Sequence, residues 1–224
     1  MLEIACFNAS SAIASAQAGA DRIELCSDYA AGGVTPSLST LEDVRSQTTS
    51  AVNVMIRPRA GDFNYTAEEF ARMEAEVVSL KPFASGFVFG ILDPNHRVDE
   101  ARNHRLVQLA APLPCTFHRA IDETDDLDEA VEAVVRCGFK NILTSGSAGN
   151  ALQGAERLHQ LQMKFGHCIS LIAGGGARNG NIGEIKRKTG VPWLHSAAIT
   201  LPGENVDVTE VRKMKDSLVE IERS

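Results

Sequence analysis

Short apolar segments recur along this chain at a regular spacing, and this recurrence restricts the possible folds more than any other feature. We predict eight β-strands, at Leu2–Phe7, Arg22–Cys26, Val52–Ile56, Gly86–Leu92, Pro114–His118, Asn141–Thr144, Cys168–Ala173 and Trp193–Ser196. Several segments are continuously apolar, as in Val54-Met55-Ile56, which is typical of parallel strands covered on both faces. Successive strands begin roughly 20 to 34 residues apart, the length of one strand followed by one helix.

The segments between the predicted strands have the apolar spacing of amphipathic helices. This spacing occurs at Phe70, Met73, Val77 and Leu80, at Leu127, Val131, Val134 and Val135, and in a last predicted helix from Val208 to Ile221. Thr66 and Asp126 each stand three residues before a glutamate, as in a capping box. Pro36 suits the first position of a helix. The chain is therefore predicted to alternate strands with helices throughout.

Two architectures accommodate this alternation, a (β/α)8 barrel and an open, doubly wound sheet. The strand count favours the barrel, and a length of 224 residues is near the lower end for that fold. Stretches rich in Gly, Pro or charge, such as 60–66 and 121–126, are too short to link two domains. We therefore predict an α/β protein with a single (β/α)8 TIM-barrel domain over residues 1–224.

Composition and charge exclude several classes of function. The formal net charge is −7 and the longest basic cluster is Lys186-Arg187-Lys188, so a surface that binds nucleic acid is not expected. No apolar run reaches the roughly 18 residues of a membrane span, and the first residues lack the pattern of a secretory signal. The five cysteines are odd in number and widely spaced, which indicates free thiols. These features predict a cytoplasmic protein that binds neither membranes nor nucleic acids.

Polar side chains gather where the predicted strands end, and in a parallel barrel those ends meet on one face. Candidates for proton transfer are carboxylates and imidazoles, namely Glu24, Asp62, His118, Asp122 and His195. Candidates for binding an anion are arginines and small residues of the strand-end loops, namely Arg57, Arg59, Arg119, Ser145, Gly174, Gly175 and Gly176. Alternatives stay open, because arginines also form internal ion pairs, strand-end histidines are often structural, and glycines often form tight turns.

The alternation of side chains along a strand separates two of the cysteines. We expect Glu3 and Glu24 to face the barrel interior, because helices cover the outer face. By the same alternation Cys26 faces the interior and Cys6 faces the helices. Cys26 is thus the thiol expected at the pocket, and a site built from both cysteines is not favoured.

Several strings of residues resemble the CutC family of copper homeostasis proteins, in order and over nearly the whole chain. They are Gly19-Ala20-Asp21-Arg22-Ile23-Glu24-Leu25-Cys26, Gly32-Gly33-Val34-Thr35-Pro36-Ser37, Ile56-Arg57-Pro58-Arg59-Ala60-Gly61-Asp62-Phe63, Thr116-Phe117-His118-Arg119-Ala120, Leu143-Thr144-Ser145-Gly146 and Ala173-Gly174-Gly175-Gly176. The resemblance implies a (β/α)8 barrel in the cytoplasm, assembled as a homodimer or higher homo-oligomer, with a role in copper tolerance. No accepted reaction is attached to the family.

The resemblance also implies copper, as Cu(I), for the cysteines near the start of the chain. The family's Leu-Glu-(Ile or Val)-Cys string appears here as Leu2-Glu3-Ile4-Ala5, with Cys6 one place later, while Cys26 matches the second family cysteine. Cys26 and Cys6 are therefore the candidate metal ligands. Two thiolates can hold Cu(I) linearly, whereas one thiolate alone makes a weak site.

Two functions follow from these observations. The first is a copper homeostasis protein that binds Cu(I) weakly through Cys26. The second is a TIM-barrel enzyme that acts on a small anionic metabolite, a phosphate or a carboxylate, in a pocket at the C-terminal ends of the strands. The first is the main prediction and the second the alternative; copper does not explain the polar strand-end groups, which suit an oxyanion better than a soft metal ion. A barrel that only binds its ligand is a third possibility, and it predicts binding without turnover.

Overall fold

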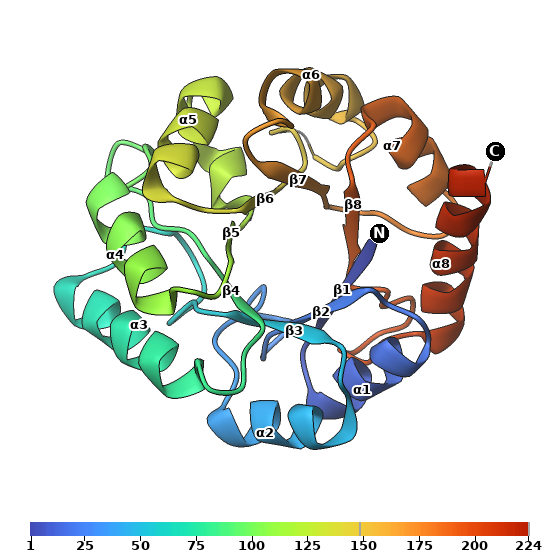
Figure 1. Cartoon of the computed structure of the whole chain (residues 1–224), viewed down its shortest axis with the longest axis horizontal. Helices are drawn as coiled ribbons and strands as arrows, with labels where there is room; N and C mark the ends of the chain where they lie inside the picture. Colours follow the sequence, from blue (N-terminus) through green and yellow to red (C-terminus); the bar gives the residue numbers. More distant parts are fainter. Residues whose placement is uncertain (148, 224) are drawn as a thin grey trace.

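Eight parallel strands close into a barrel, and helices surround it (Figure 1). The computed structural model describes residues 1–147 and 149–223. In chain order the elements are β1 (Leu2–Cys6), α1 (Ala9–Gln17), β2 (Arg22–Leu25), α2 (Leu38–Gln47), β3 (Ala51–Met55), α3 (Ala67–Leu80), β4 (Gly86–Phe89), α4 (Glu100–Ala110), β5 (Cys115–Phe117), the 3₁₀ helix η1 (Arg119–Glu123), α5 (Leu127–Cys137), β6 (Asn141–Thr144), α6 (Ala155–Phe165), β7 (Ser170–Ala173), α7 (Ile182–Thr189), β8 (Trp193–Ser196) and α8 (Val208–Arg223). The predicted (β/α)8 barrel is confirmed, and the open sheet is excluded because β1 pairs with β8.

The helix starts follow the capping signals of the sequence in two cases of three. At α3 both halves of the Thr66 capping box form, and at α5 the Asp126 carboxylate accepts the backbone N–H of Glu129. The expected start at Pro36 is wrong. The hydroxyl of Ser37 accepts the backbone N–H of Thr40, so α2 begins after Ser37 and Pro36 lies outside the helix.

Strand β4 is shorter than the sequence predicts. It ends at Phe89, although the apolar run continues to Leu92. The reason is the side chain of Asn103, which bonds both the backbone N–H and the carbonyl oxygen of Ile91 and so removes that residue from the sheet. Apolar character alone therefore marks burial here, and it does not mark the end of the strand.

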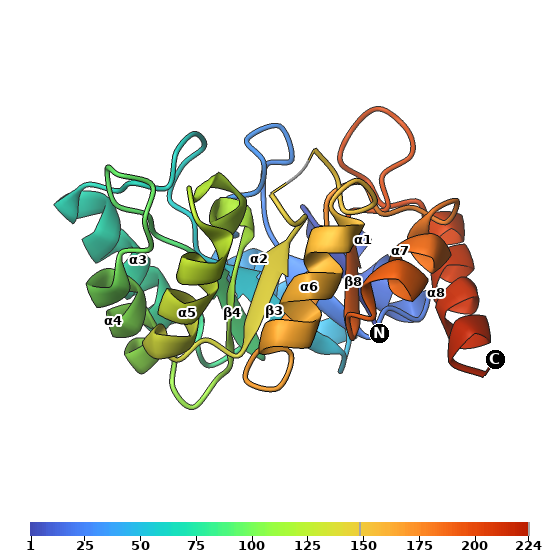
Figure 2. The same ribbon diagram turned by 90° about the horizontal axis from the view of Figure 1, so that it is seen from above.

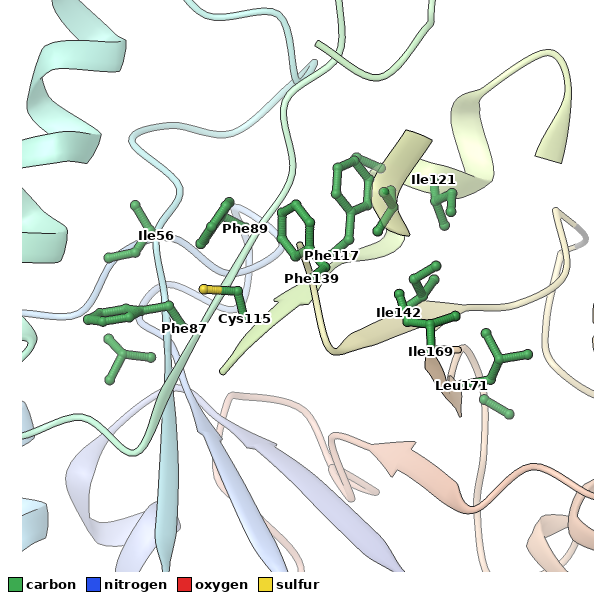
Figure 3. Packing of buried hydrophobic residues seen from close by; sticks show 14 of the residues in the cluster. Ile56, Phe87, Phe89, Cys115, Phe117, Ile121, Phe139, Ile142, Ile169 and Leu171 are labelled. Atoms are coloured by element: carbon green, nitrogen blue, oxygen red, sulfur yellow. The ribbon is translucent and has the colours of Figure 1, made fainter. Parts of the chain in front are cut away.

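The outer face of the barrel carries most of the apolar core. Side chains from the strands pack there against the helices, and Figure 3 shows part of this layer around the β4–β7 strands. The ring of Phe139 lies 5.0 Å from that of Phe89 and 5.3 Å from that of Phe117, measured between centroids. These residues are fully or nearly fully buried, so each removes a large apolar area from water on folding.

The interior of the barrel is more polar. The register places Glu3 beside Arg22 on one side and beside His195 on the other, while Glu24 lies beside Asn53. Only a small apolar cluster occupies the interior near these groups, made of Ala5, Phe7, Cys26, Met55, Val88 and Ile199. The longer loops rise from the edge at which the strands end (Figure 2), above this polar interior.

Within the described ranges no helix is both long and apolar enough to cross a membrane. The five cysteines are free thiols, and Cys168 is the exposed one.

Candidate functional site

A pocket of about 280 Å³ opens at the carboxyl ends of the strands. Its polar lining comes from strand ends and from the loops after them: Glu24, Arg57, His118, Arg119, Arg178 and His195. Gly175, Gly176 and Cys26 also line it, and Phe7, Met55 and Phe63 form apolar wall. The pocket thus brings together part of the predicted set of polar strand-end residues.

Four ionisable side chains, which we call the floor, form a chain of contacts at the pocket; Glu24 and His195 line the pocket, and Glu3 and Arg22 do not. Arg22 Nε lies 2.5 Å from Glu3 Oε2, and Glu3 Oε1 lies 2.8 Å from His195 Nδ1. His195 Nε2 in turn lies 3.8 Å from Glu24 Oε2. The register explains the contacts, because β8, β1 and β2 are neighbours and place these side chains on the same inner face. The expectation that Glu3 and Glu24 face inward is borne out by these contacts.

Burial and neighbouring charges shift the floor groups in different directions. For His195 burial works to lower the pKa, but the charges of Glu24 and Glu3 and the hydrogen bond to Glu3 raise it overall. Burial works to raise the pKa of Glu3, but the hydrogen bond from His195 and the charge of Arg22 lower it overall. Burial, supported by the nearby charge of Glu3, raises the pKa of Glu24. The two carboxylates therefore differ, and Glu24 is the one that holds a proton more easily.

His118 is buried in a neutral form. Its Nδ1 accepts the backbone N–H of Ala120 at 3.3 Å, which places the ring proton on Nε2. Burial, together with the nearby charge of Arg57, lowers the pKa of His118 to about 3. Its ring packs on Phe63, 4.8 Å away between centroids. His118 therefore presents a fixed N–H donor and not an imidazolium.

Arg57 lines the pocket and also holds a loop. Its guanidinium donates to the carbonyl oxygens of Ala31 at 3.1 Å, Gly33 at 3.3 Å and Gly61 at 2.8 Å. Its Cζ lies 4.8 Å from the centroid of the Phe63 ring. Neither the anion nor the ion-pair interpretation anticipated these bonds to backbone oxygens, which leave its positive charge without a carboxylate in the described part of the chain.

Arg59 and Asp62 do not belong to the pocket, contrary to the sequence prediction. Arg59 pairs with Asp62 at 2.8 Å and with Glu69 at 2.6 Å, at the start of α3. The Asp62 side chain is 69% exposed. The physical reason is the turn at Gly61, where φ is +89°: the chain has left strand β3, so the alternation of a strand no longer decides where side chains point.

Arg119 reaches the pocket, and Asp122 and Ser145 hold it there. Arg119 Nε donates to Asp122 Oδ2 at 2.8 Å and its Nη2 donates to Ser145 Oγ at 3.1 Å. Asp122 also accepts the backbone N–H of Ser145 at 3.1 Å. Asp122 and Ser145 do not line the pocket. Asp122 is thus the ion-pair partner of Arg119, and its predicted catalytic role finds no support in its position.

The glycine run after β7 brings the backbone close to Arg119. Gly175 and Gly176 have φ of +98° and +75°, which a side chain would strain. A Cβ on Gly175 would lie 3.3 Å from Arg119 Nη1. Gly174 faces the barrel interior instead, where a Cβ would meet Leu143 Cδ1 at 2.5 Å. Two of the three predicted glycines therefore line the pocket, and the third allows strand packing beneath it.

Arg178 is a pocket residue that sequence reasoning missed. Its guanidinium bonds the backbone oxygens of Ala177 and Ile199 and the hydroxyl of Ser196. It follows the predicted glycine run by two residues, and that position after β7 was the signal that could have found it. Like Arg57, it has no carboxylate partner among the residues that the structure describes.

The two candidate copper ligands lie on opposite faces of the barrel wall. Cys6 Sγ lies 3.4 Å from Ser15 Oγ of α1, in the outer layer, whereas Cys26 Sγ donates to Glu24 Oε2 at 3.6 Å in the pocket. Burial, followed by the charge of Glu24, raises the pKa of the Cys26 thiol well above its ordinary value. Cu(I) prefers two thiolates, and the pocket offers one protonated thiol. The two cysteines therefore do not form a Cu(I) site together.

A second group of side chains could hold a metal ion, and its donor atoms are harder than a thiolate. One ligand atom each from Glu3, Glu24 and His195 can be chosen so that all lie within 4.8 Å of one another. Carboxylate oxygens and imidazole do not suit a soft monovalent ion. Within this cluster Glu3 already bonds Arg22 and His195, so its charge is balanced inside the protein.

Comparison with known proteins gives one consistent result. The CutC family matches residues 1–200. A family protein CutC from Mesorhizobium japonicum is 40% identical over 200 residues, which is 89% of this chain and 78% of that protein. The human copper homeostasis protein cutC homolog is 37% identical over 199 residues, 88% of this chain and 73% of the human protein.

A solved structure agrees with the sequence matches. The crystal structure of the protein named CutC from Streptococcus agalactiae superposes with a TM-score of 0.83 at 28% identity, covering 88% of this chain and 98% of that chain. The resemblance that the sequence strings carried is thereby confirmed, together with its implied barrel. This chain belongs to the CutC family, and its human relative is named a copper homeostasis protein cutC homolog.

Proposed function

We propose that this protein is a TIM-barrel enzyme that binds a small anionic metabolite, a phosphate or a carboxylate, in the pocket at the carboxyl ends of its strands. One observation carries the proposal, which is the charge balance of the pocket. The floor is balanced, because Arg22 faces Glu3 and His195 faces Glu24, and Arg119 faces Asp122. Arg57 and Arg178 remain without a countercharge in the described residues.

An uncompensated guanidinium in a partly enclosed pocket is unfavourable unless a ligand supplies the negative charge. Arg57 and Arg178 are held in place by bonds to neutral oxygens, so their positions do not depend on a ligand. Arg119 lines the same pocket, and its Nη1 lies beside Gly175. A bound anion would meet a rigid, preformed set of donors, which limits the entropy lost on binding.

The copper relation comes to this chain through the names of its relatives. Cu(I) binding through Cys26 receives less support, because Cys6 lies outside the pocket and the Cys26 thiol keeps its proton and donates a hydrogen bond to Glu24. We also propose a cytoplasmic location, which the free thiols favour.

The test is a binding measurement with two arginine variants. Isothermal titration calorimetry with inorganic phosphate and with malonate should detect binding of at least one of them to the wild-type protein. Arg178→Gln should weaken it at least about tenfold, or about 1.4 kcal/mol, because one charged donor is lost. Arg59→Gln is the matched control, since Arg59 lies outside the pocket, and it should bind as the wild type does. Absence of binding, or an equal loss in both variants, would contradict the proposal.

A further inference from the structure

Three buried polar atoms of pocket-lining residues have no hydrogen-bond partner in the part of the chain that the structure describes, namely Arg57 Nε, Glu24 Oε1 and His118 Nε2. The rest of the Arg57 guanidinium is held by backbone oxygens, whereas Glu24 and His118, which are only 3% and 4% exposed, are the two residues of this set suited to handling a proton. A buried polar atom without a partner is unfavourable by roughly 1–3 kcal/mol. Glu24 Oε1 and His118 Nε2 belong to residues that line the same pocket, so both are candidates to bond a ligand there.

The rest of each side chain is already fixed. The Ala120 N–H occupies His118 Nδ1 at 3.3 Å, so the ring cannot turn its proton away from the pocket without losing that bond. Glu24 Oε2 accepts from Cys26 Sγ at 3.6 Å and lies 3.8 Å from His195 Nε2. Each residue therefore offers one remaining atom, an N–H donor from His118 and a carboxylate oxygen from Glu24.

These two atoms differ in what they can do for a reaction. A neutral imidazole that donates a hydrogen bond can stabilise negative charge that develops on an oxygen, without becoming charged itself. A carboxylate oxygen without a donor can take a proton from carbon. The pair is complementary: one atom accepts a proton and the other stabilises the oxygen on which the resulting charge collects.

We propose that the reaction is a proton transfer at the carbon next to a carbonyl group, in a substrate that also carries a phosphate or a carboxylate. This proposal rests on the proposed function. Glu24 Oε1 takes the proton, the C–H electron pair forms a C=C bond, and the carbonyl π pair moves onto its oxygen. His118 Nε2–H donates to that oxygen. Return of the proton from Glu24 to carbon restores the carbonyl, so no oxidant, reductant or co-reactant is required.

The anionic part of the substrate occupies a different group of pocket residues. Arg119 and Arg178 line the pocket with Gly175 and Gly176, and none of these residues contributes to the pair of unpartnered atoms. Binding energy from the anion can thus hold the reacting carbon near Glu24, which is how remote contacts contribute to the rate. His195 lies between Glu3 and Glu24, so in this scheme it positions Glu24 and is itself held by Glu3.

Deuterium exchange from D2O, followed by proton NMR, tests the reaction class. The probes are dihydroxyacetone phosphate and pyruvate, which carry the two kinds of anion and have exchangeable hydrogens next to a carbonyl. The wild-type protein should accelerate exchange of one probe at least about tenfold over buffer, a change of about 1.4 kcal/mol. Glu24→Gln should abolish the acceleration, and Asp62→Asn, the same change outside the pocket, should leave it intact.

A second measurement uses the wild-type protein, so it does not depend on whether the Glu24→Gln variant folds. In protein labelled with ¹⁵N-histidine, the Nε2–H signal of His118 should move downfield when 2-phosphoglycolate is added, because the planar carboxylate resembles the charged intermediate. Exchange no faster than buffer for both probes, in a protein that binds phosphate through Arg178, would overturn the reaction class and leave the proposed binding function standing. Loss of anion binding itself would instead remove the proposed function.

Discussion

The two faces of the barrel wall follow different rules. The outer face is packed with apolar side chains such as Phe87 and Phe89, which are fully buried against the helices. The inner face holds Glu3, Glu24 and His118, which are equally buried but charged or polar. Both faces are made by the same strands, and only the alternation of side chains separates them.

This difference separates stability from chemistry. Apolar burial on the outer face supplies favourable free energy in proportion to the area removed from water. The inner face gives up part of that gain, since it buries charges and leaves Glu24 Oε1 and His118 Nε2 without partners. Polar groups kept at such a disadvantage are typical of binding and catalytic sites. The changes below test the division, from the largest expected effect to the smallest.

Truncation on the outer face should have the largest effect. Phe89→Ala removes a fully buried ring that packs on Phe139, and we expect a loss of about 4 kcal/mol in the free energy of unfolding. Urea unfolding followed by circular dichroism measures it. Val78→Ala is the control, because Val78 is 59% exposed and should change stability by less than about 0.5 kcal/mol. A similar loss in both variants would contradict the layered core.

The pH dependence of stability should report the buried neutral His118. Its pKa is about 3 in the folded chain and about 6.5 when unfolded, so between these values the unfolded chain binds more protons. Stability should therefore fall as the pH is lowered from 6.5 towards 3. His118→Asn removes this contribution, so between pH 7 and pH 4.5 the variant should lose about 2 kcal/mol less than the wild type. Parallel curves of unfolding free energy against pH would refute a neutral His118.

A substitution on the inner face should raise the free energy of unfolding, whereas the outer-face truncation lowers it. Thr116 is buried and its Oγ1 has no hydrogen-bond partner within residues 1–147 and 149–223. Thr116→Val replaces this hydroxyl with a methyl group, so we expect a gain of about 1 kcal/mol in the free energy of unfolding. A loss of stability in the same urea measurement would mean that the hydroxyl does have a partner, and the inner face would then be better satisfied than we infer.

The smallest effect is expected at the cysteines. An anaerobic Cu(I) titration against a competing chelator should give the same affinity for Cys26→Ser, Cys6→Ser and the wild type within about twofold, or about 0.4 kcal/mol, because the two thiols lie on opposite faces of the wall. A selective loss for Cys26→Ser would restore this residue as a copper ligand and would show that the pocket serves a soft metal.

The barrel itself could be predicted from the sequence because strands and helices each produce a regular spacing of apolar residues. The strands Asn141–Thr144 and Trp193–Ser196 are found at the predicted residues, and alternation correctly separated Cys6 from Cys26. The alternation of side chains between the two faces of the wall ends where a strand ends. Arg57 and Arg59 stand two residues apart with the same parity, yet one lines the pocket and the other pairs with Glu69 on α3.

Site residues held by tertiary hydrogen bonds left no pattern in the sequence. The position of Arg178 depends on Ser196 and on the carbonyl oxygen of Ile199, some twenty residues later. The neutral state of His118 depends on one backbone N–H, that of Ala120. Such features arise only when loops from several strands meet, so a single sequence identifies the face of the barrel and misses part of the site.

The closure of the barrel between β1 and β8 has a consequence for the order of assembly. Arg22 is 19 positions from Glu3, but His195 is 192 positions from it. During synthesis the first pair can meet early, while the imidazole that completes the pocket floor arrives with the last strand. Contacts of such long range are slow to form. We therefore expect the Glu3–Arg22 contact to form before the Glu3–His195 contact, so that the pocket is completed last.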